Sequence, residues 1–342
     1  MSHTVKLIGA PQSPYSRKMR AALRYRRIPF QWLRQGSPET QGQPDVKLKN
    51  MIPVVWLSHK NSTQDVALLD STFQLQHLET MYSERSLTPI DPVVKFFDRL
   101  IEDFGDEWMT KCMFHYRWAR EQDVKKAGVI IPLEVKWNWA DDQIKEFQDT
   151  FADRQVGRLG YVGSNDVTAP VIEESYLNIL QALNSILTKQ PFLMGNRPGA
   201  ADFGVFGQLV CLTQFDPTPS AVALEVAPRV YAWVEAMEDV SGDAVTDADW
   251  IKREDIKETW GSLLTEFGRT YAPYLLGNAD AIRKGAEQVQ CNIDGREWVQ
   301  NPFPYQKKCL QWLQEEFSAL NVDDQQYVRN ILENTGCDIL FD

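Results

Sequence analysis

Apolar and polar residues alternate in short segments along the first 84 residues of the chain. Four short apolar runs predict strands: residues 4–10 (TVKLIGA), 30–33 (FQWL), 52–57 (IPVVWL) and 65–70 (DVALLD). After Pro14, which the first turn of a helix tolerates, apolar residues recur at helical spacing. A second helix is expected to start at Asp70-Ser71 and to include Leu75 and Leu78. The predicted order is βαβ followed by ββα.

From Pro92 onward, apolar residues recur every three to four positions, which is the helical period. The longest stretch of this kind runs from Val93 to about Gln122, and others cover residues 175–193, 195–212 and 228–239. Residues 241–249 (SGDAVTDAD) form a polar linker. Beyond the linker we expect two or three more helices, together with a hairpin that turns at Asp294-Gly295.

These patterns predict three parts: an α/β domain over residues 1–84, an all-helical domain over 90–240 and a mainly helical extension over 250–342. A length of 342 residues suits two domains of about 150 residues with an addition. The amphipathic segments of the extension are too short to form a core alone. We therefore expect them to pack back onto the helical domain.

The composition argues against several classes of function. The chain has 36 lysines and arginines against 47 aspartates and glutamates, a net charge of −11, and so lacks the basic footprint that nucleic-acid binding leaves. No apolar run predicts a membrane span, and the first residues lack the apolar segment of a secretory signal. The five cysteines include no C-x-x-C pair and the four histidines show no zinc spacing, so no metal site is expected. A reduced cytoplasmic protein fits these features.

Three short motifs follow one another in the first domain: SPYS at 13–16, IPVV at 52–55 and DS at 70–71. Each alone is a common local structure, because Ser and Asp cap helices and a residue before proline is extended. Their order, with a helical domain behind them, resembles the cytosolic glutathione S-transferase superfamily in its serine-type, bacterial-like form. The segment MGNRPGAADFGVF resembles the helix-start signature of that family's second domain, with Gly199 in place of the usual capping hydroxyl and Asp202 retained.

The resemblance covers roughly residues 1–240. It implies a thioredoxin-like, glutathione-binding domain over 1–84 and an all-helical C-terminal transferase domain over 90–240. Residues 250–342 take no part in it. Glutathione as co-substrate, a small-molecule electrophile as partner and a homodimer are further implications of the resemblance.

The resemblance gives Ser13 the catalytic role. Its hydroxyl would donate to the sulfur of glutathione and stabilise the thiolate at the positive end of a helix. Ser13 and Ser16 stand where a redox protein would carry the two cysteines of a CPYC motif, so mixed-disulfide chemistry is unavailable. The alternative is that Ser13 only caps the helix, while Tyr15, Ser16 or a backbone N–H orients the sulfur.

The other two motifs would hold the rest of the peptide. A cis Pro53, as in the family, would present the backbone of Ile52 to the cysteinyl backbone of glutathione. At the start of the next helix, Ser71 would bind the γ-glutamyl carboxylate and Asp70 would lie near the ammonium.

Two cations, Lys49 and Arg17, are candidates for contacts with the peptide. Met51 stands where the family often has a basic residue for the glycine carboxylate. Lys49 could substitute for that residue, or the affinity for glutathione is low. Arg17 is a further cation near the predicted site, and an exposed helix arginine is the alternative interpretation.

An electrophile pocket is expected between the first domain and the long helix that begins at Val93. Trp108, Cys112 and His115 fall on one stripe of that helix and would line the pocket. The alternative is that the stripe belongs to the core, with His115 as a buried and hydrogen-bonded histidine.

The sequence therefore predicts a glutathione transferase that conjugates glutathione to an unidentified apolar electrophile. A non-catalytic binding or scaffold protein with the same fold is the alternative, since a fold does not by itself confer an activity. Reduction of dehydroascorbate or disulfides is a third hypothesis, and the missing active-site cysteine argues against it.

Overall fold

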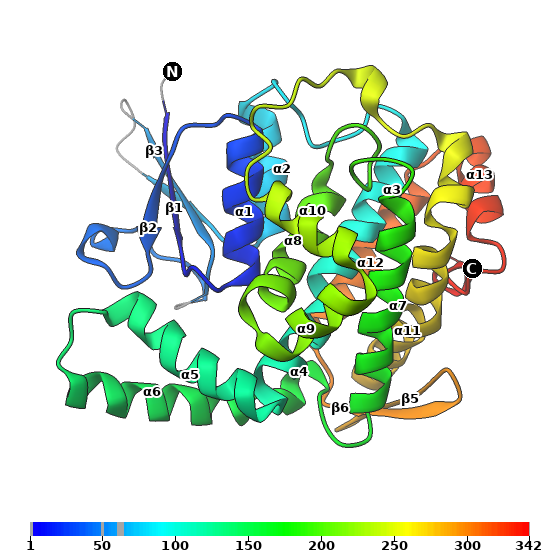
Figure 1. Cartoon of the computed structure of the whole chain (residues 1–342). Coiled ribbons are helices and arrows are strands. Elements are labelled where there is room, and N and C mark those ends of the chain that lie inside the picture. The colour runs from blue at the N-terminus through cyan, green and yellow to red at the C-terminus, as the bar shows by residue number, and fades with distance from the viewer. Residues whose placement is uncertain (1–2, 49–50, 60–64, 342) are drawn as a thin grey trace.

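The computed structural model describes residues 3–48, 51–59 and 65–341. A small sheet with its flanking helices lies against a larger helical body (Figure 1). In the chain after residue 250, α11 (Ile256–Lys284) and α13 (Val322–Leu332) lie on the side of the helical body away from the sheet (Figure 1). Among the described residues, no helix is both long enough and apolar enough to cross a membrane.

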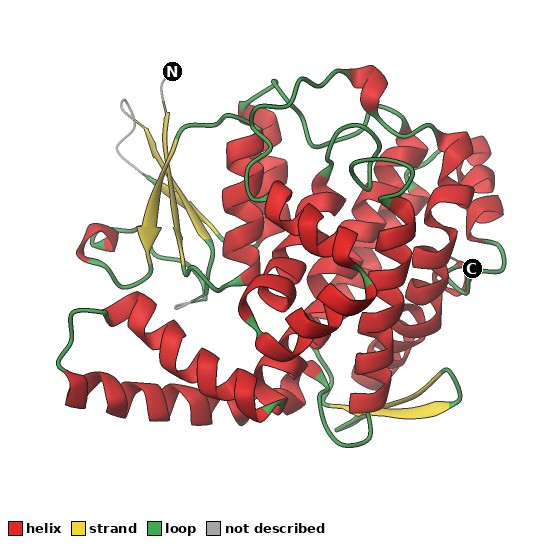
Figure 2. Ribbon diagram, viewed as in Figure 1, coloured by secondary structure: helices red, strands yellow, loops and turns green. Residues whose placement is uncertain are grey.

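The first domain consists of β1 (His3–Gly9), α1 (Pro14–Tyr25), β2 (Phe30–Arg34), η1 (Pro38–Thr40), β3 (Val54–His59), β4 (Val66–Leu68) and α2 (Ser71–Met81). The sheet order is β2-β1-β3-β4, in which β1 is parallel to β2 and antiparallel to β3, and β3 is antiparallel to β4 (Figure 2). This is the thioredoxin-like arrangement that the sequence predicts. The predicted strand and helix order is confirmed.

The alternation of side chains along the strands explains how the sheet is covered. Val5 and Leu7 of β1 point to one face and belong to the main core of the molecule. Ile8 points to the opposite face and packs with Val54 and Trp56 in a small separate cluster. Successive strand residues face opposite sides of a sheet, so each face has its own apolar set.

The helical body contains α3 (Pro92–Asp103), the π-helical turn η2 (Phe104–Trp108), α4 (Met109–Ala119), α5 (Glu121–Lys136), α6 (Asp141–Val156), η3 (Leu159–Val162), α7 (Ala169–Ile186), α8 (Ala200–Val210), the π-helical turn η4 (Cys211–Phe215), α9 (Pro217–Val226) and α10 (Pro228–Met237). The helix expected from Val93 to Gln122 is therefore interrupted by η2 and ends at Ala119. It ends there because Arg120 has an extended backbone, with φ −110° and ψ 123°.

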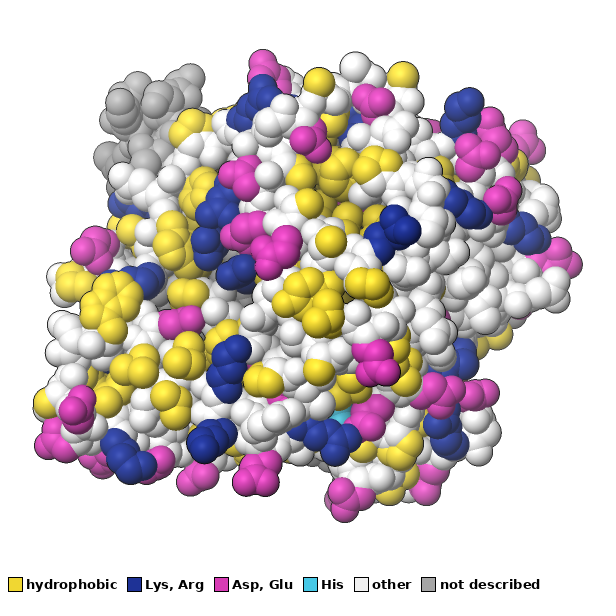
Figure 3. All heavy atoms as spheres, in the orientation of Figure 1, with side chains coloured by type: hydrophobic (Ala, Val, Ile, Leu, Met, Phe, Trp, Pro, Cys, Tyr) yellow, Lys and Arg dark blue, Asp and Glu magenta, His cyan; other side chains and the backbone are white. Residues whose placement is uncertain are grey.

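The hairpin of α5 and α6 is absent from the sequence prediction. It runs beneath the sheet in Figure 1, and in α6 only Ile144 is buried. A helix with a single buried side chain gives a weak apolar period, which explains why the pattern does not reveal it. In Figure 3, apolar side chains gather over this hairpin and the neighbouring sheet, and acidic and basic side chains are interspersed over the rest of the face.

The extension contains η5 (Asp247–Asp249), η6 (Arg253–Asp255), α11 (Ile256–Lys284), β5 (Val289–Ile293), β6 (Arg296–Gln300), α12 (Pro304–Ser318), α13 (Val322–Leu332) and η7 (Asp338–Leu340). The predicted hairpin is confirmed, since β5 and β6 pair antiparallel around Asp294 and Gly295, which have φ of 52° and 76°. Positive φ at both central residues is what a two-residue hairpin turn of this kind requires.

The extension packs against the helical body, as predicted. Trp260 of α11 donates from Nε1 to the carbonyl of Leu193 over 2.9 Å, and the Tyr271 hydroxyl donates to Oδ2 of Asp103 over 2.8 Å. The ring of Trp298 lies 5.3 Å from that of Trp108. These contacts join the extension to the same apolar core as the rest of the chain.

Candidate functional site

The SPYS motif forms the turn from β1 into α1. Ser13 is the half-buried N-cap residue, and its Oγ accepts a hydrogen bond from the backbone N–H of Ser16 over 3.3 Å. No described residue accepts the proton of the Ser13 hydroxyl, which remains a donor for a bound group. Ser16 is buried, and its Oγ accepts from the N–H of Ala10 over 3.3 Å. Both hydroxyls accept a backbone N–H, but Ser16 is fully buried, so only the half-buried Ser13 can present its hydroxyl to a ligand.

Neighbouring helices hold this turn in place. Arg117 of α4 donates from Nη1 to the carbonyl of Gln12 over 2.9 Å and forms an ion pair of 3.0 Å with Asp216. The side chain of Gln12 donates from Nε2 to Oε1 of Glu134 on α5 over 3.0 Å. A Cβ on Gly207 of α8 would lie 2.7 Å from a backbone oxygen of α1, so glycine allows these two helices to approach closely.

The peptide between Ile52 and Pro53 is cis, as the resemblance implies. Gln74 of α2 is buried and donates from Nε2 to the carbonyl of Pro53 over 2.8 Å and to that of Leu68 over 2.7 Å. One amide thus ties the proline loop to β4 and to α2. Sequence reasoning missed Gln74, because its role depends on two carbonyls brought together only by the fold. Met51 is 53% exposed, and Lys49 lies outside the described residues.

Asp70 and Ser71 begin α2, as predicted. Asp70 is the N-cap, with φ 70°, and its Oδ1 accepts from the N–H of Thr72 over 3.1 Å. Ser71 is buried. The other carboxylate oxygen of Asp70 accepts a hydrogen bond from the hydroxyl of Tyr305 in the extension. The sequence gives no indication of this contact.

Tyr15 and Arg17 already have partners within the protein. The Tyr15 hydroxyl donates to the carbonyl of Asp106 over 2.8 Å. Burial and then the charge of Glu107 raise the pKa of Tyr15, which therefore remains a neutral donor. Arg17 forms an ion pair of 2.9 Å with Glu238 at the end of α10. This pair accounts for Arg17 without a ligand, so its substrate-binding role gains no support from the structure.

A buried ionic cluster joins the helices that carry these motifs. Lys18 of α1 lies 2.6 Å from Glu102 and 2.5 Å from Asp106, and the hydroxyl of Thr72 donates to Glu102 over 3.0 Å. Burial lowers the pKa of Lys18, but the two carboxylates outweigh burial and raise it. Burial opposes ionisation of Glu102, yet Lys18 and Arg99 lower its pKa. The cluster fixes α1, α2 and α3 relative to one another.

Two cavities lie beside the segment 34–46 of the first domain. One, of about 290 Å³, is lined by Met51, Ile52 and the segment 35–46. The other, of about 470 Å³, lies between the segment 34–41 and the turn that joins α5 to α6, which contributes Trp137 and Trp139. The guanidinium of Arg34 lies 3.6 Å from the centre of the Trp137 ring and donates to the carbonyl of Glu134 over 3.2 Å.

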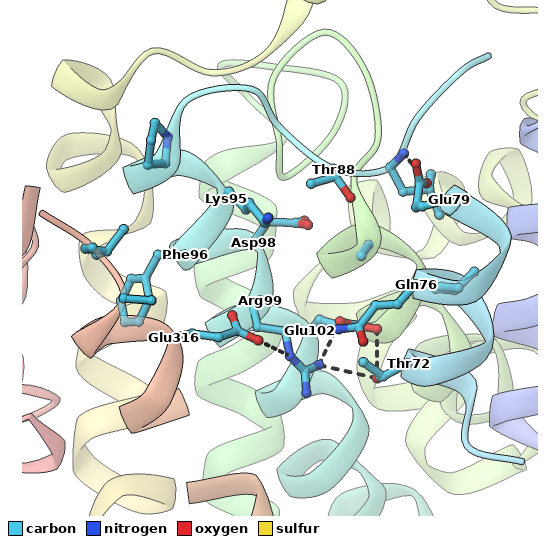
Figure 4. Close-up of a pocket in the computed structure, with 16 residues that line it drawn as sticks. Thr72, Gln76, Glu79, Thr88, Lys95, Phe96, Asp98, Arg99, Glu102 and Glu316 are labelled. Atoms are coloured by element: carbon cyan, nitrogen blue, oxygen red, sulfur yellow. Dashed lines mark hydrogen bonds and ion pairs between the residues drawn. The ribbon is translucent and has the colours of Figure 1, made fainter. Parts of the chain in front are cut away.

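A third cavity, of about 670 Å³, lies between α2, α3 and α12 (Figure 4). Arg99 points into its lower part, where it donates to Glu102 over 2.8 Å and to the hydroxyl of Thr72 over 3.3 Å. Glu316 of the extension lies 3.4 Å from Arg99. The wall of this cavity therefore links the extension to the first turn of α2.

The stripe of Trp108, Cys112 and His115 lies in the core. Trp108 donates from Nε1 to Oγ of Ser175 over 2.8 Å, and the thiol of Cys112 lies 3.7 Å from the carbonyl of Ile172. The ring nitrogens of His115 lie 2.8 Å from Oγ of Ser164 and 3.0 Å from Oε1 of Glu173. All three side chains are buried.

These contacts correct the expectation of an electrophile pocket on this stripe. An apolar stripe at helical spacing packs against whatever lies opposite, and here that is α7 and the extension rather than an opening to solvent. The core interpretation applies to all three residues.

Comparison with known proteins gives two family matches. A family model described as glutathione S-transferase, N-terminal domain, matches residues 7–86, and one described as glutathione S-transferase, C-terminal domain, matches residues 139–236. Residues 237–342 lie outside both. No curated protein sequence matches the chain significantly.

Several solved structures are similar at low sequence identity. The β-etherase LigF from Sphingobium sp. strain SYK-6 is 19% identical over 68% of this chain and 94% of its own, with a TM-score of 0.48. FzlA from C. crescentus is 18% identical over 74% of this chain and 98% of its own, with a TM-score of 0.44. A glutathione transferase family member from Pseudomonas fluorescens was solved with two glutathione molecules bound. It is 19% identical over 69% of this chain and 92% of its own, with a TM-score of 0.39.

The family matches agree with the order of elements and with the three motifs of the first domain. Together the two models span more than half of the chain, and this protein belongs to the glutathione S-transferase superfamily.

Proposed function

We propose that this protein binds glutathione and conjugates it to an apolar electrophile, with Ser13 stabilising the thiolate. The observation that carries the proposal is the Ser13 hydroxyl at the N-terminus of α1, half-buried and with its proton unused by the described residues. A thiolate near a helix N-terminus is stabilised by the helix dipole, and a hydroxyl donor adds a hydrogen bond to the charged sulfur.

The remaining motif residues would bind the peptide backbone and its γ-glutamyl end. The cis peptide before Pro53 leaves Ile52 at the rim of the 290 Å³ cavity, where its backbone could pair with the cysteinyl backbone of glutathione. The N-terminus of α2 suits a carboxylate, so Ser71 and the backbone N–H groups would bind the γ-glutamyl carboxylate. Asp70 would face the ammonium. That Lys49 binds the glycine carboxylate stays a prediction from the sequence.

With the stripe of Trp108 assigned to the core, the electrophile needs another apolar site near Ser13. We place it in the 470 Å³ cavity beside the α5–α6 turn, because Glu134 of α5 holds Gln12, which precedes Ser13. Trp137 and Trp139 are 63% and 41% exposed there and would pack against an apolar substrate.

A non-catalytic binding protein is the second candidate. The burial of Trp108, Cys112 and His115 favours it, because the stripe expected to bind an electrophile packs against protein instead. Titration calorimetry with glutathione, followed by initial rates with a panel of apolar electrophiles, separates the candidates. Binding with turnover supports the transferase, and binding without turnover on any electrophile supports the second candidate. The homodimer and the cytoplasmic location stay predictions.

A further inference from the structure

The extension contacts one of the motifs assigned to glutathione. Tyr305, the second residue of α12, donates a hydrogen bond to Oδ2 of Asp70, a residue 235 positions earlier in the chain. The contact places the extension at the γ-glutamyl end of the proposed site.

The position of Tyr305 is fixed from both sides. Before it, the backbone of Phe303 forms two hydrogen bonds with the side chain of Asn278, of 2.8 Å and 3.0 Å. After it, the buried Gln306 donates to Oε2 of Glu107 over 2.9 Å and accepts from the Tyr274 hydroxyl over 2.5 Å. Two anchored neighbours leave the Tyr305 hydroxyl little freedom to move away from Asp70.

Asp70 keeps the capacity to bind a cation while these donors are present. A carboxylate offers about four acceptor positions, and here one is used by the Thr72 N–H and one by the Tyr305 hydroxyl. The two donors reach different oxygens, so they fix the plane of the carboxylate. A preoriented carboxylate binds a ligand with a smaller loss of freedom than one that must be ordered on binding.

The surroundings also suit a positively charged group. The charges of Asp70 and Glu107 act on both Tyr15 and Tyr305, which therefore border one acidic region. Burial and then Glu107 raise the pKa of Tyr305, which remains a neutral hydroxyl that donates to Asp70.

We propose that Tyr305 is a positioning residue for substrate recognition: it orients Asp70 so that this carboxylate binds the α-ammonium of the γ-glutamyl group. This inference rests on the proposed function. It makes the extension part of the glutathione site within a single chain, through residues beyond both matched family regions.

The test compares two ligands on Tyr305→Phe. One ligand is glutathione, and the other is its glutaryl analogue, in which hydrogen replaces the α-amino group. The substitution keeps the ring contacts of Tyr305 with Phe303 and Trp312, at 6.4 Å and 5.9 Å between ring centres. We expect glutathione affinity by calorimetry to fall about two- to tenfold, the value of one hydrogen bond, while affinity for the analogue stays within about twofold. Turnover at saturating glutathione should be unchanged.

Two further variants make the result specific. Tyr327→Phe makes the same chemical change on α13 of the extension, where the ring lies 5.4 Å from the guanidinium of Arg253, and should leave both affinities unchanged. In the Asp70→Asn background, Tyr305→Phe should weaken glutathione binding no further, because its effect passes through Asp70.

The outcomes separate this inference from the proposed function. Equal or tighter glutathione binding by Tyr305→Phe, or equal losses for both ligands, would overturn the role of Tyr305 and leave the proposed function standing. Tighter binding would show that the hydroxyl competes with the ammonium for Asp70. A wild-type protein that does not bind glutathione would overturn both.

Discussion

The ammonium group of Lys18 lies 2.6 Å from a carboxylate oxygen of Glu102, and the two side chains are 0% and 3% exposed. This pair connects α1, which begins at the SPYS motif, to α3 of the helical body. Removing one partner of a buried ion pair leaves the other charge without compensation in a medium that solvates it poorly. The pair therefore matters for how the two domains are held together.

We expect Lys18→Met to lower the free energy of unfolding by about 3–5 kcal/mol, measured by urea denaturation. Lys145→Met is the matched control, because Lys145 pairs with Asp149 where both side chains are more than half exposed. Exposed pairs contribute about 1 kcal/mol or less. A loss of that smaller size for Lys18→Met would show that the cluster is hydrated in solution.

Because the His115 ring is buried, we expect the free energy of unfolding to depend on pH. Burial, and then Arg120, lower the pKa of His115 to about 4 from its ordinary 6.5. Between these values the unfolded chain binds more protons than the folded one, so stability is complete above about pH 6.5 and is lost as the pH falls towards 4. The loss amounts to about 3 kcal/mol. His115→Gln should flatten this part of the stability curve.

The exposed His77 supplies the control for the His115 experiment. His77→Gln makes the same substitution at an exposed side chain, so the two stability curves separate the effect of the buried ring from that of the substitution itself. If the free energy of unfolding of His115→Gln changes with pH as steeply as that of the wild type, His115 is not the group responsible for the pH dependence.

Docking of the C-terminal segment can be tested at one residue. Phe341 is buried, with its ring 5.4 Å from that of Phe96 and 4.9 Å from that of Phe317. Phe341→Ala should destabilise the fold by about 3–5 kcal/mol in urea denaturation. Ile339→Ala, at a 40% exposed neighbour, should cost about 1 kcal/mol or less. Similar small effects from both would mean that this segment is undocked in solution.

Local patterns could predict the first domain but not the contacts that build its site. The strands, the caps at Ser13 and Asp70 and the turn at Asp294 depend on neighbours in sequence, and each was predictable. Gln74 and Lys18 could not be assigned, because their partners are set by tertiary packing. The contact of Tyr305 with Asp70 spans 235 positions, and no periodicity encodes such a pairing.

The helical body shows a second limit of sequence reasoning. The spacing of Trp108, Cys112 and His115 indicates a shared apolar face, yet it does not tell whether a ligand or another helix covers that face. Here α7 and the extension cover it. The π-helical turn at Phe104–Trp108 leaves no signal in the apolar period, and so the predicted helix was continuous.

The oligomeric state is a further prediction. We expect a homodimer of twice 39.3 kDa in light scattering, as the family resemblance implies, and exposed apolar residues such as Ile90 remain available for an interface. The dimer fraction should stay constant on dilution through the micromolar range. A mass of 39.3 kDa would instead indicate that α12 and α13, which pack on α3, cover the surface that the dimer needs.

The last prediction concerns the Ser13 hydroxyl. If it donates to the bound thiolate, Ser13→Ala should raise the pKa of enzyme-bound glutathione by about one to two units, since a hydrogen bond to a charged group contributes about 1.5–3 kcal/mol. Glutathione affinity should change little, whereas turnover at pH 7 should fall. Ultraviolet titration of the thiolate absorbance measures the pKa directly.

Two serine variants complete the Ser13 experiment. Ser16→Ala should cost stability without moving the thiol pKa, because the buried Ser16 Oγ accepts from the N–H of Ala10 inside the protein. Ser71→Ala should weaken glutathione binding by about 1–2 kcal/mol and leave the pKa of the bound thiol unchanged, since it removes a contact with the γ-glutamyl carboxylate. Identical titration curves for wild type and Ser13→Ala would show that Ser13 only caps the helix. Because the Tyr15 hydroxyl donates within the protein and Ser16 is fully buried, a backbone N–H at the start of α1 would then be the group that orients the sulfur.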